Sequence, residues 1–205
     1  MKTEIDAWWE SNAENTLRLN YPLNEDSIVF DLGGCRGTFA EKIYNKYESN
    51  IYIFEPLSKF IKEIKKTFKE NNKVRVFDYG VSGKTGDLDL VVSEDASYLI
   101  SHRDVEDADG RDIETVKIKS FKDAYDETGV DKIDLMKINV EGAEYEIMQN
   151  IFDNDLVSKI NNFQIQFHDI TDDSERLVLD IREKLSETHN LDWKFDWVWE
   201  NWSLK

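Results

Sequence analysis

The first motif that could carry chemistry is a glycine turn after a short apolar run. It reads Asp31-Leu-Gly33-Gly34-Cys35-Arg36-Gly37 and precedes a helix-length amphipathic stretch. Such a turn lets the backbone approach a ligand, and the start of a helix favours the ligand's anionic part. A glycine turn can also serve only to pack a helix on a strand.

An acidic residue, Glu55, ends the next apolar run, 22 residues after Gly33. A carboxylate there can accept from both hydroxyls of a ribose, in a dinucleotide or in S-adenosylmethionine. A dinucleotide fingerprint needs a second glycine where Cys35 stands, so that the backbone can touch a pyrophosphate. S-adenosylmethionine has no phosphate, and Asp31 could help to neutralise its ammonium. The spacing therefore favours S-adenosylmethionine.

A second pair of polar residues, Asn139 and Glu141, follows a later apolar run. In open α/β sheets ligands lie at the carboxyl ends of strands, so this pair should face the same crevice as Gly33 and Glu55. Asn139 has both a donor and an acceptor and could hold an ammonium or a substrate hydroxyl. Glu141 could act on the substrate, or it could be only a favourable charge at the start of a helix.

The third motif is His168-Asp169, at the end of the following run. His168 is a candidate general base, and Asp169 could orient it. A histidine at the end of a strand can equally be a structural hydrogen-bonding group. Cys35 is disfavoured as a nucleophile because no histidine lies near it in the sequence to activate it.

The elements that must position these residues alternate along the chain. Apolar runs typical of strands occupy 27–33, 50–56, 74–81, 133–140 and 161–168. Amphipathic stretches typical of helices occupy 38–47, 57–71, 141–152 and 174–188. This alternation predicts an α/β fold with a parallel sheet and helices on both faces.

Residues 87–114 break the alternation, with ten carboxylates and two arginines that give −8 of the formal net charge of −17. They begin as an alternating pattern and then lose periodicity, which predicts a short edge strand and a long acidic excursion. That excursion is either a solvated loop or a lid that faces the substrate.

All six tryptophans lie near the ends of the sequence, at 8, 9, 193, 197, 199 and 202. The odd positions from 193 to 199 are all aromatic, which predicts a strand with one aromatic face. That face could pack against a helix, with the N-terminal pair covering the rest, or it could form a wall for a substrate ring such as a sugar.

Length and charge restrict the class of protein. The 205 residues, 40% of them hydrophobic, suit one domain over 1–205, with an extension at 1–26, the acidic insertion at 87–114 and an aromatic strand at 190–205. The negative charge argues against nucleic-acid and membrane partners. One cysteine excludes an internal disulfide and a Cys-rich zinc site, and we predict no metal. Without a membrane-length apolar run or a signal-peptide core, we expect a cytoplasmic protein.

Four segments then occur in a recognisable order: Val29-Phe-Asp31-Leu-Gly33 with Gly37, Phe54-Glu55-Pro56, Gly80-Val-Ser82 with Gly86, and Ile133-Asp134-Leu-Met-Lys137-Ile-Asn139-Val-Glu141-Gly142-Ala-Glu144. Over roughly 20–170 the chain resembles the FkbM family of S-adenosylmethionine-dependent methyltransferases. The resemblance implies a Rossmann-like class I methyltransferase fold, a mainly parallel seven-stranded sheet with a C-terminal antiparallel hairpin. It also adds Pro56 and Gly80 to the cofactor-binding candidates. The family usually has Asp where Asn139 stands.

We therefore expect O-methylation of a hydroxyl on a sugar, a glycan or a small natural product. His168, Asp169 and Glu141 are the catalytic candidates. The cofactor-binding candidates are Asp31, Gly33, Gly34, Gly37, Glu55, Pro56, Gly80 and Asn139. An NAD-dependent oxidoreductase and a catalytically idle binding or interaction protein of the same fold are the alternatives.

Overall fold

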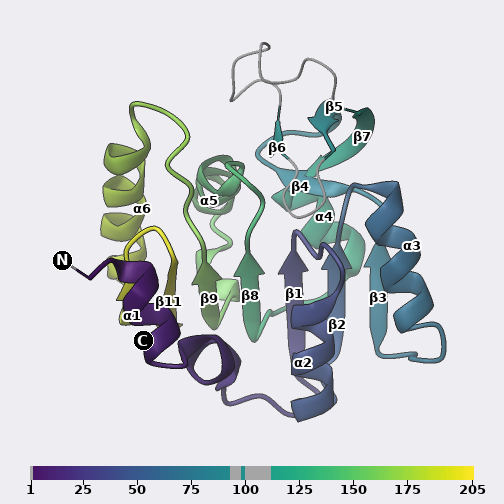
Figure 1. Cartoon of the computed structure of the whole chain (residues 1–205), viewed down its shortest axis with the longest axis horizontal. Coiled ribbons are helices and arrows are strands. Elements are labelled where there is room, and N and C mark those ends of the chain that lie inside the picture. The colour runs from purple at the N-terminus through teal and green to yellow at the C-terminus, as the bar shows by residue number, and fades with distance from the viewer. Residues whose placement is uncertain (1, 93–97, 100–111) are drawn as a thin grey trace.

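A seven-stranded sheet forms the centre of the computed structural model, which describes residues 2–92, 98–99 and 112–205 (Figure 1). The strand order is β10-β11-β9-β8-β1-β2-β3. The parallel strands are β1 (Ile28–Leu32), β2 (Asn50–Phe54), β3 (Val74–Phe77), β8 (Leu135–Ile138) and β9 (Asn162–Ile165). The antiparallel hairpin consists of β10 (His189–Phe195) and β11 (Trp199–Leu204). The predicted fold class is confirmed.

Helices cover both faces because side chains alternate along each strand. On β1, Val29 packs with α2 (Thr38–Tyr47) and α3 (Ser58–Thr67), whereas Phe30 belongs to the larger core on the other face. That core includes α4 (Phe121–Thr128), α5 (Glu144–Asp153) and α6 (Ser174–Thr188). The remaining short helices are α1 (Glu4–Glu10), η1 (Ala13–Asn15), η2 (Leu17–Leu19) and η5 (Val157–Lys159).

A smaller sheet, in the order β4-β7-β5-β6, lies beyond the carboxyl ends of the central strands (Figure 1). Its strands are β4 (Gly80–Ser82), β5 (Gly86–Val91), β6 (Tyr98–Leu99) and β7 (Ile113–Ser120). The predicted strand 74–81 is thus two strands, because β3 pairs with β2 and β4 pairs with β7. The acidic stretch 87–114 begins in β5 and ends in β7, and most of what lies between falls outside the described residues.

The aromatic run at the C-terminus is not one strand, as the alternation predicted, but a hairpin with its turn at 196–198. Trp197 has a φ of 61° in that turn, and Val198 N donates to Phe195 O at 3.0 Å. The aromatic rings of Trp193 and Phe195 pack on Trp8 of α1, with ring centroids 5.8 and 5.3 Å apart. The packing interpretation therefore holds for Trp8, which is buried, but not for Trp9, which is 62% exposed.

Candidate cofactor and catalytic site

A cavity opens at the carboxyl ends of β1, β2 and β8, between the central sheet and the smaller sheet. The central sheet contributes Gly33, Glu55, Asn139 and Glu141 to its lining. The other lining residues are mainly apolar: Cys35, Pro56, Leu57, Phe60, Gly80, Val81, Leu88, Leu90, Ile118, Val140 and Ala143. This arrangement agrees with the prediction that residues from distant strand ends meet in one crevice.

Glu55 is the buried carboxylate of the cavity, with 4% of its surface exposed. Its Oε2 accepts from the backbone N of Cys35 at 2.8 Å, and its Oε1 accepts from the backbone N of Leu57 at 2.9 Å. Burial raises the pKa of Glu55 to about 7, although the two amides and the positive charge of Lys137 act to lower it. Each carboxylate oxygen keeps a second lone pair for a ligand.

The glycine turn is pressed against the end of β8. Gly33 has a φ of +78°, and a Cβ there would lie 1.9 Å from the backbone oxygen of Asn139, so no other residue fits. Gly34 and Gly37 do not line the cavity. A Cβ at Gly34 would lie 2.2 Å from the Ile53 side chain, so this glycine serves the packing of the turn on β2.

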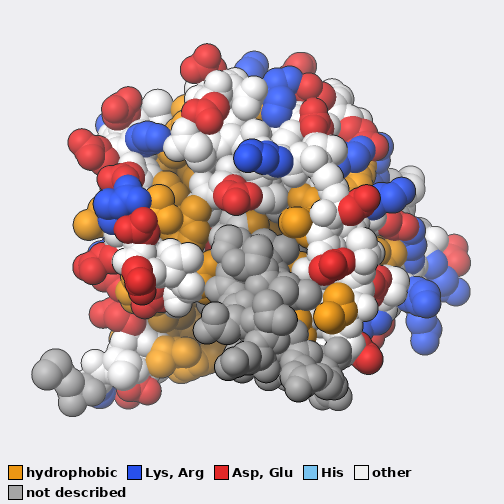
Figure 2. Space-filling model, turned by 90° about the horizontal axis from the view of Figure 1, so that it is seen from above, with side chains coloured by type: hydrophobic (Ala, Val, Ile, Leu, Met, Phe, Trp, Pro, Cys, Tyr) orange, Lys and Arg blue, Asp and Glu red, His pale blue; other side chains and the backbone are white. Residues whose placement is uncertain are grey.

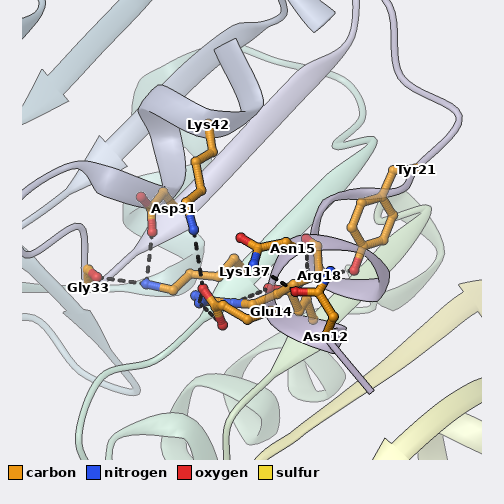
Figure 3. Close-up of polar contacts among 10 residues, drawn as sticks. Asn12, Glu14, Asn15, Arg18, Tyr21, Asp31, Gly33, Lys42 and Lys137 are labelled. Carbon is orange, nitrogen blue, oxygen red and sulfur yellow. Dashed lines mark hydrogen bonds and ion pairs between the residues drawn. The ribbon is translucent and has the colours of Figure 1, made fainter. Parts of the chain in front are cut away.

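Asp31 does not line the cavity either, although the sequence suggested it for the cofactor's ammonium. It is fully buried, and its Oδ1 accepts from Lys137 Nζ at 2.9 Å (Figure 3). Its Oδ2 has no hydrogen-bond partner among the described residues. The side-chain partner of Asp31 is therefore Lys137, for which the sequence motifs predicted no role.

Asn139 brings an unsatisfied acceptor to the cavity. Its side-chain Oδ1 is buried and has no hydrogen-bond partner within the described part of the chain. A buried polar atom left unpaired costs free energy, so an orphaned oxygen in a cavity wall indicates a place where a ligand donates. An ammonium or a hydroxyl group would satisfy it.

Glu141, His168 and Glu144 form a cluster beside the cavity. Glu144 is fully buried, and its Oε1 lies 2.7 Å from His168 Nδ1 and accepts from the backbone N of Val140 at 3.2 Å. On the other side of the ring, Nε2 lies 3.6 Å from Glu141 Oε2. Of the three, only Glu141 lines the cavity.

The cluster differs from the predicted arrangement in two ways. Helix α5 begins at Glu144, not at 141, so Glu141 lies in the preceding turn with a φ of 54°. The carboxylate against the imidazole is that of Glu144, while Asp169 is exposed. Sequence spacing could not reveal this contact, because 24 residues separate the two partners.

The remaining hypotheses concern other groups. The Cys35 thiol is half-buried, and burial raises its pKa, which disfavours a thiolate nucleophile. The described lining contains no tryptophan, so the aromatic face belongs to the fold and is not a wall of this cavity. Among residues 2–92, 98–99 and 112–205, no group of three or more His, Cys, Asp and Glu side chains could hold a metal ion. Within the same ranges, no helix has the length and apolar character that crossing a bilayer needs.

Comparison with solved structures indicates the same fold as the topology does. SMU.1697c of Streptococcus mutans, solved in complex with SAH, has a TM-score of 0.56 at 10% identity, with 100% of this chain and 99% of that one covered. An rRNA methylase of Streptococcus thermophilus has a TM-score of 0.50 at 11% identity, with 100% and 99% covered. Fibrillarin of Aeropyrum pernix, with natively bound S-adenosyl-L-methionine, has a TM-score of 0.51 at 10% identity, with 95% and 74% covered.

Sequence comparison identifies the family. None of the curated proteins compared with the chain matches it. The family model described as the methyltransferase FkbM domain matches residues 31–192, which include every residue of the cavity lining. The match confirms the resemblance of the sequence motifs and covers most of the chain, which therefore belongs to the FkbM family of methyltransferases.

Proposed function

We propose that the protein transfers a methyl group from S-adenosylmethionine to a hydroxyl group of a sugar, a glycan or a small natural product. The observation that carries this proposal is one apolar cavity that holds a buried carboxylate and an orphaned amide oxygen. Glu55 supplies the first and Asn139 the second.

The residues present fit this cofactor. The free lone pairs of Glu55 suit two ribose hydroxyls, and Asn139 Oδ1 suits an ammonium group. Leu57, Val81 and Ile118 offer apolar walls for an adenine ring. When bound, S-adenosylmethionine supplies an activated methyl group on a positively charged sulfur.

The cluster beside the cavity suits proton removal. Because the Glu144 carboxylate can only accept, we assign the imidazole proton to Nδ1. Nε2 then carries a lone pair on the side of Glu141, which is the state that a general base requires. His168 would take the proton of the acceptor hydroxyl, Glu144 would hold the ring, and Glu141 would position the hydroxyl at the cavity wall.

Charge favours a neutral acceptor over a nucleic acid, although the structural neighbours include an rRNA methylase. The described lining of the cavity contains two glutamates and no lysine or arginine. Figure 2 shows carboxylates around much of this face, together with lysines and arginines at its top, its left side and its right edge. A site that neutralises few phosphates binds a phosphate backbone weakly.

The test is methyl transfer by the purified protein, measured as S-adenosylhomocysteine formed. We expect turnover with neutral glycosides or hydroxylated natural products, and none with RNA. Asp172→Asn, an exposed change in the loop after His168, should behave as the wild type does. Turnover on RNA alone would overturn the assignment of the acceptor. Cofactor binding without turnover on any acceptor would favour the idle binding protein.

A further inference from the structure

A row of buried polar side chains crosses the sheet face under α2 and the N-terminal segment. Asp31, Lys137, Gln164 and Asn201 are register partners on the adjacent strands β1, β8, β9 and β11. Each of them is at most 3% exposed. Burying polar groups costs free energy unless they are paired, so each member of the row needs specific partners.

Lys137 uses all of its donors on the end of β1 and the turn that follows. Its ammonium donates to Asp31 Oδ1 at 2.9 Å and to Gly33 O at 2.7 Å (Figure 3). It also donates to Leu32 O at 3.3 Å. An ammonium has three donors, so the group is saturated. The shortest of the three contacts is to the carbonyl of the cavity-lining glycine, not to the carboxylate.

The Gly33 peptide is thereby held from both sides. The amides of Gly33 and Gly34 donate to Phe54 O at 3.0 and 3.2 Å, which ties the turn to β2. Lys137 holds the carbonyl side and ties the same turn to β8. Lys137 also stands two residues before Asn139, so a single strand end carries both the group that holds the turn and an amide of the cavity wall.

We propose that Lys137 is a positioning residue for cofactor binding. Its ammonium fixes the Gly33 carbonyl and so fixes the gap between the glycine turn and Asn139. Asp31 is the counter-ion of this ammonium. An ion pair alone does not account for a buried lysine here, since buried ion pairs are often replaceable by apolar residues. The identity of the ligand rests on the proposed function, but the role of Lys137 in the turn does not.

The test separates the ion pair from the contact with Gly33. Lys137→Met alone leaves Asp31 charged and unpaired, so the pair of changes Asp31→Asn with Lys137→Met is the informative variant. We expect this double variant to bind S-adenosylhomocysteine at least tenfold more weakly than the wild type in calorimetry. Its Gly33 and Gly34 amides should also exchange faster with solvent.

Two further variants complete the design. Asp31→Asn keeps the ammonium on Gly33 O and should keep near-native affinity. Gln164→Met alters the same buried row but contacts Arg18 and Tyr21 instead of the turn, so it should lower the melting temperature without changing affinity.

Two results would overturn the proposal. One is a folded double variant with native affinity and native amide exchange. The other, decisive even if the double variant fails to fold, is Asp31→Asn losing affinity tenfold, because the ion pair would then be what matters. If the wild type binds no S-adenosylhomocysteine, the proposed function fails, and amide exchange at Gly33 and Gly34 still decides the role of Lys137.

Discussion

Glu55 should make cofactor binding depend on pH near neutrality. Its pKa is raised to about 7 by burial, so near pH 7 the unliganded protein is a mixture of protonated and ionised forms. Ribose hydroxyls donate most strongly to the ionised carboxylate. Binding must therefore release the proton that Glu55 holds at lower pH, and affinity should rise as pH rises through about 7.

The size of the effect follows from the ionised fraction. A carboxyl group with a pKa of about 7 is about nine-tenths ionised at pH 8 and about one-tenth ionised at pH 6. The Kd for S-adenosylhomocysteine should thus be about tenfold weaker at pH 6 than at pH 8, or about 1.4 kcal/mol. Calorimetry in two buffers of different ionisation enthalpy would also show about half a proton released per ligand at pH 7.

Glu55→Gln is the control, because it keeps the shape of the side chain and removes the titration. Its affinity should be weaker and nearly independent of pH. A glutamine amide has one oxygen, so it cannot accept from both Cys35 N and Leu57 N as the two carboxylate oxygens do. The free energy of unfolding should therefore also fall by about 1–3 kcal/mol. A wild-type Kd that is flat from pH 6 to pH 8, or the same slope in the glutamine variant, would refute this reasoning.

Four further outcomes are expected. His168→Gln should lower methyl transfer by about 10²–10⁴-fold with unchanged S-adenosylhomocysteine affinity, and near-normal turnover would make His168 structural. Gly33→Ala should abolish binding in calorimetry, since its Cβ would lie 1.9 Å from Asn139 O; Gly86→Ala, with nothing within 4 Å, should bind normally. Trp8→Ala should lower the free energy of unfolding in urea by about 3–5 kcal/mol without changing affinity, and a loss below about 1 kcal/mol would contradict its place in the core. The pKa of Glu55 is raised from 4.5 to about 7, so its protonated form adds about 3 kcal/mol to the free energy of unfolding. This contribution is full below pH 4.5 and is lost as pH rises through about 7. Urea titrations should show the loss for the wild type and not for Glu55→Gln.

The residues that follow the strands were the part of the site that the sequence could predict. Gly33, Glu55, Asn139 and Glu141 each follow an apolar run, and parallel strands necessarily bring such positions to one edge. Their detailed contacts depend on packing, which sequence spacing does not record. Glu144, for example, lies against His168, which is 24 residues away in the sequence, and α5 begins three residues later than its pattern suggested.

Two further signals in the sequence have a physical meaning that the structure makes plain. Lys137 is a charge among the apolar residues of β8, and a buried charge needs a partner, which Asp31 provides from β1. Residues 113–120 form β7, whose side chains tend to alternate between exposed and buried positions. The acidic stretch before them obscured this strand in the sequence. The chain turns at 196–198, although the alternation of aromatic residues continues through these positions and so gave no sign of the turn.

The contacts that build the cavity join residues at very different separations along the chain, which sets the order in which its walls can form. The bond from Cys35 N to Glu55 closes a loop of 20 residues, whereas the bond from Lys137 to Asp31 joins residues 106 apart. Loop-closure entropy favours the shorter contact, so the β1-α2-β2 unit can form early with Glu55 already in place. The wall that contains Asn139 forms only when β8 inserts beside β1. Binding competence should therefore appear late in refolding, together with docking of the chain's second half.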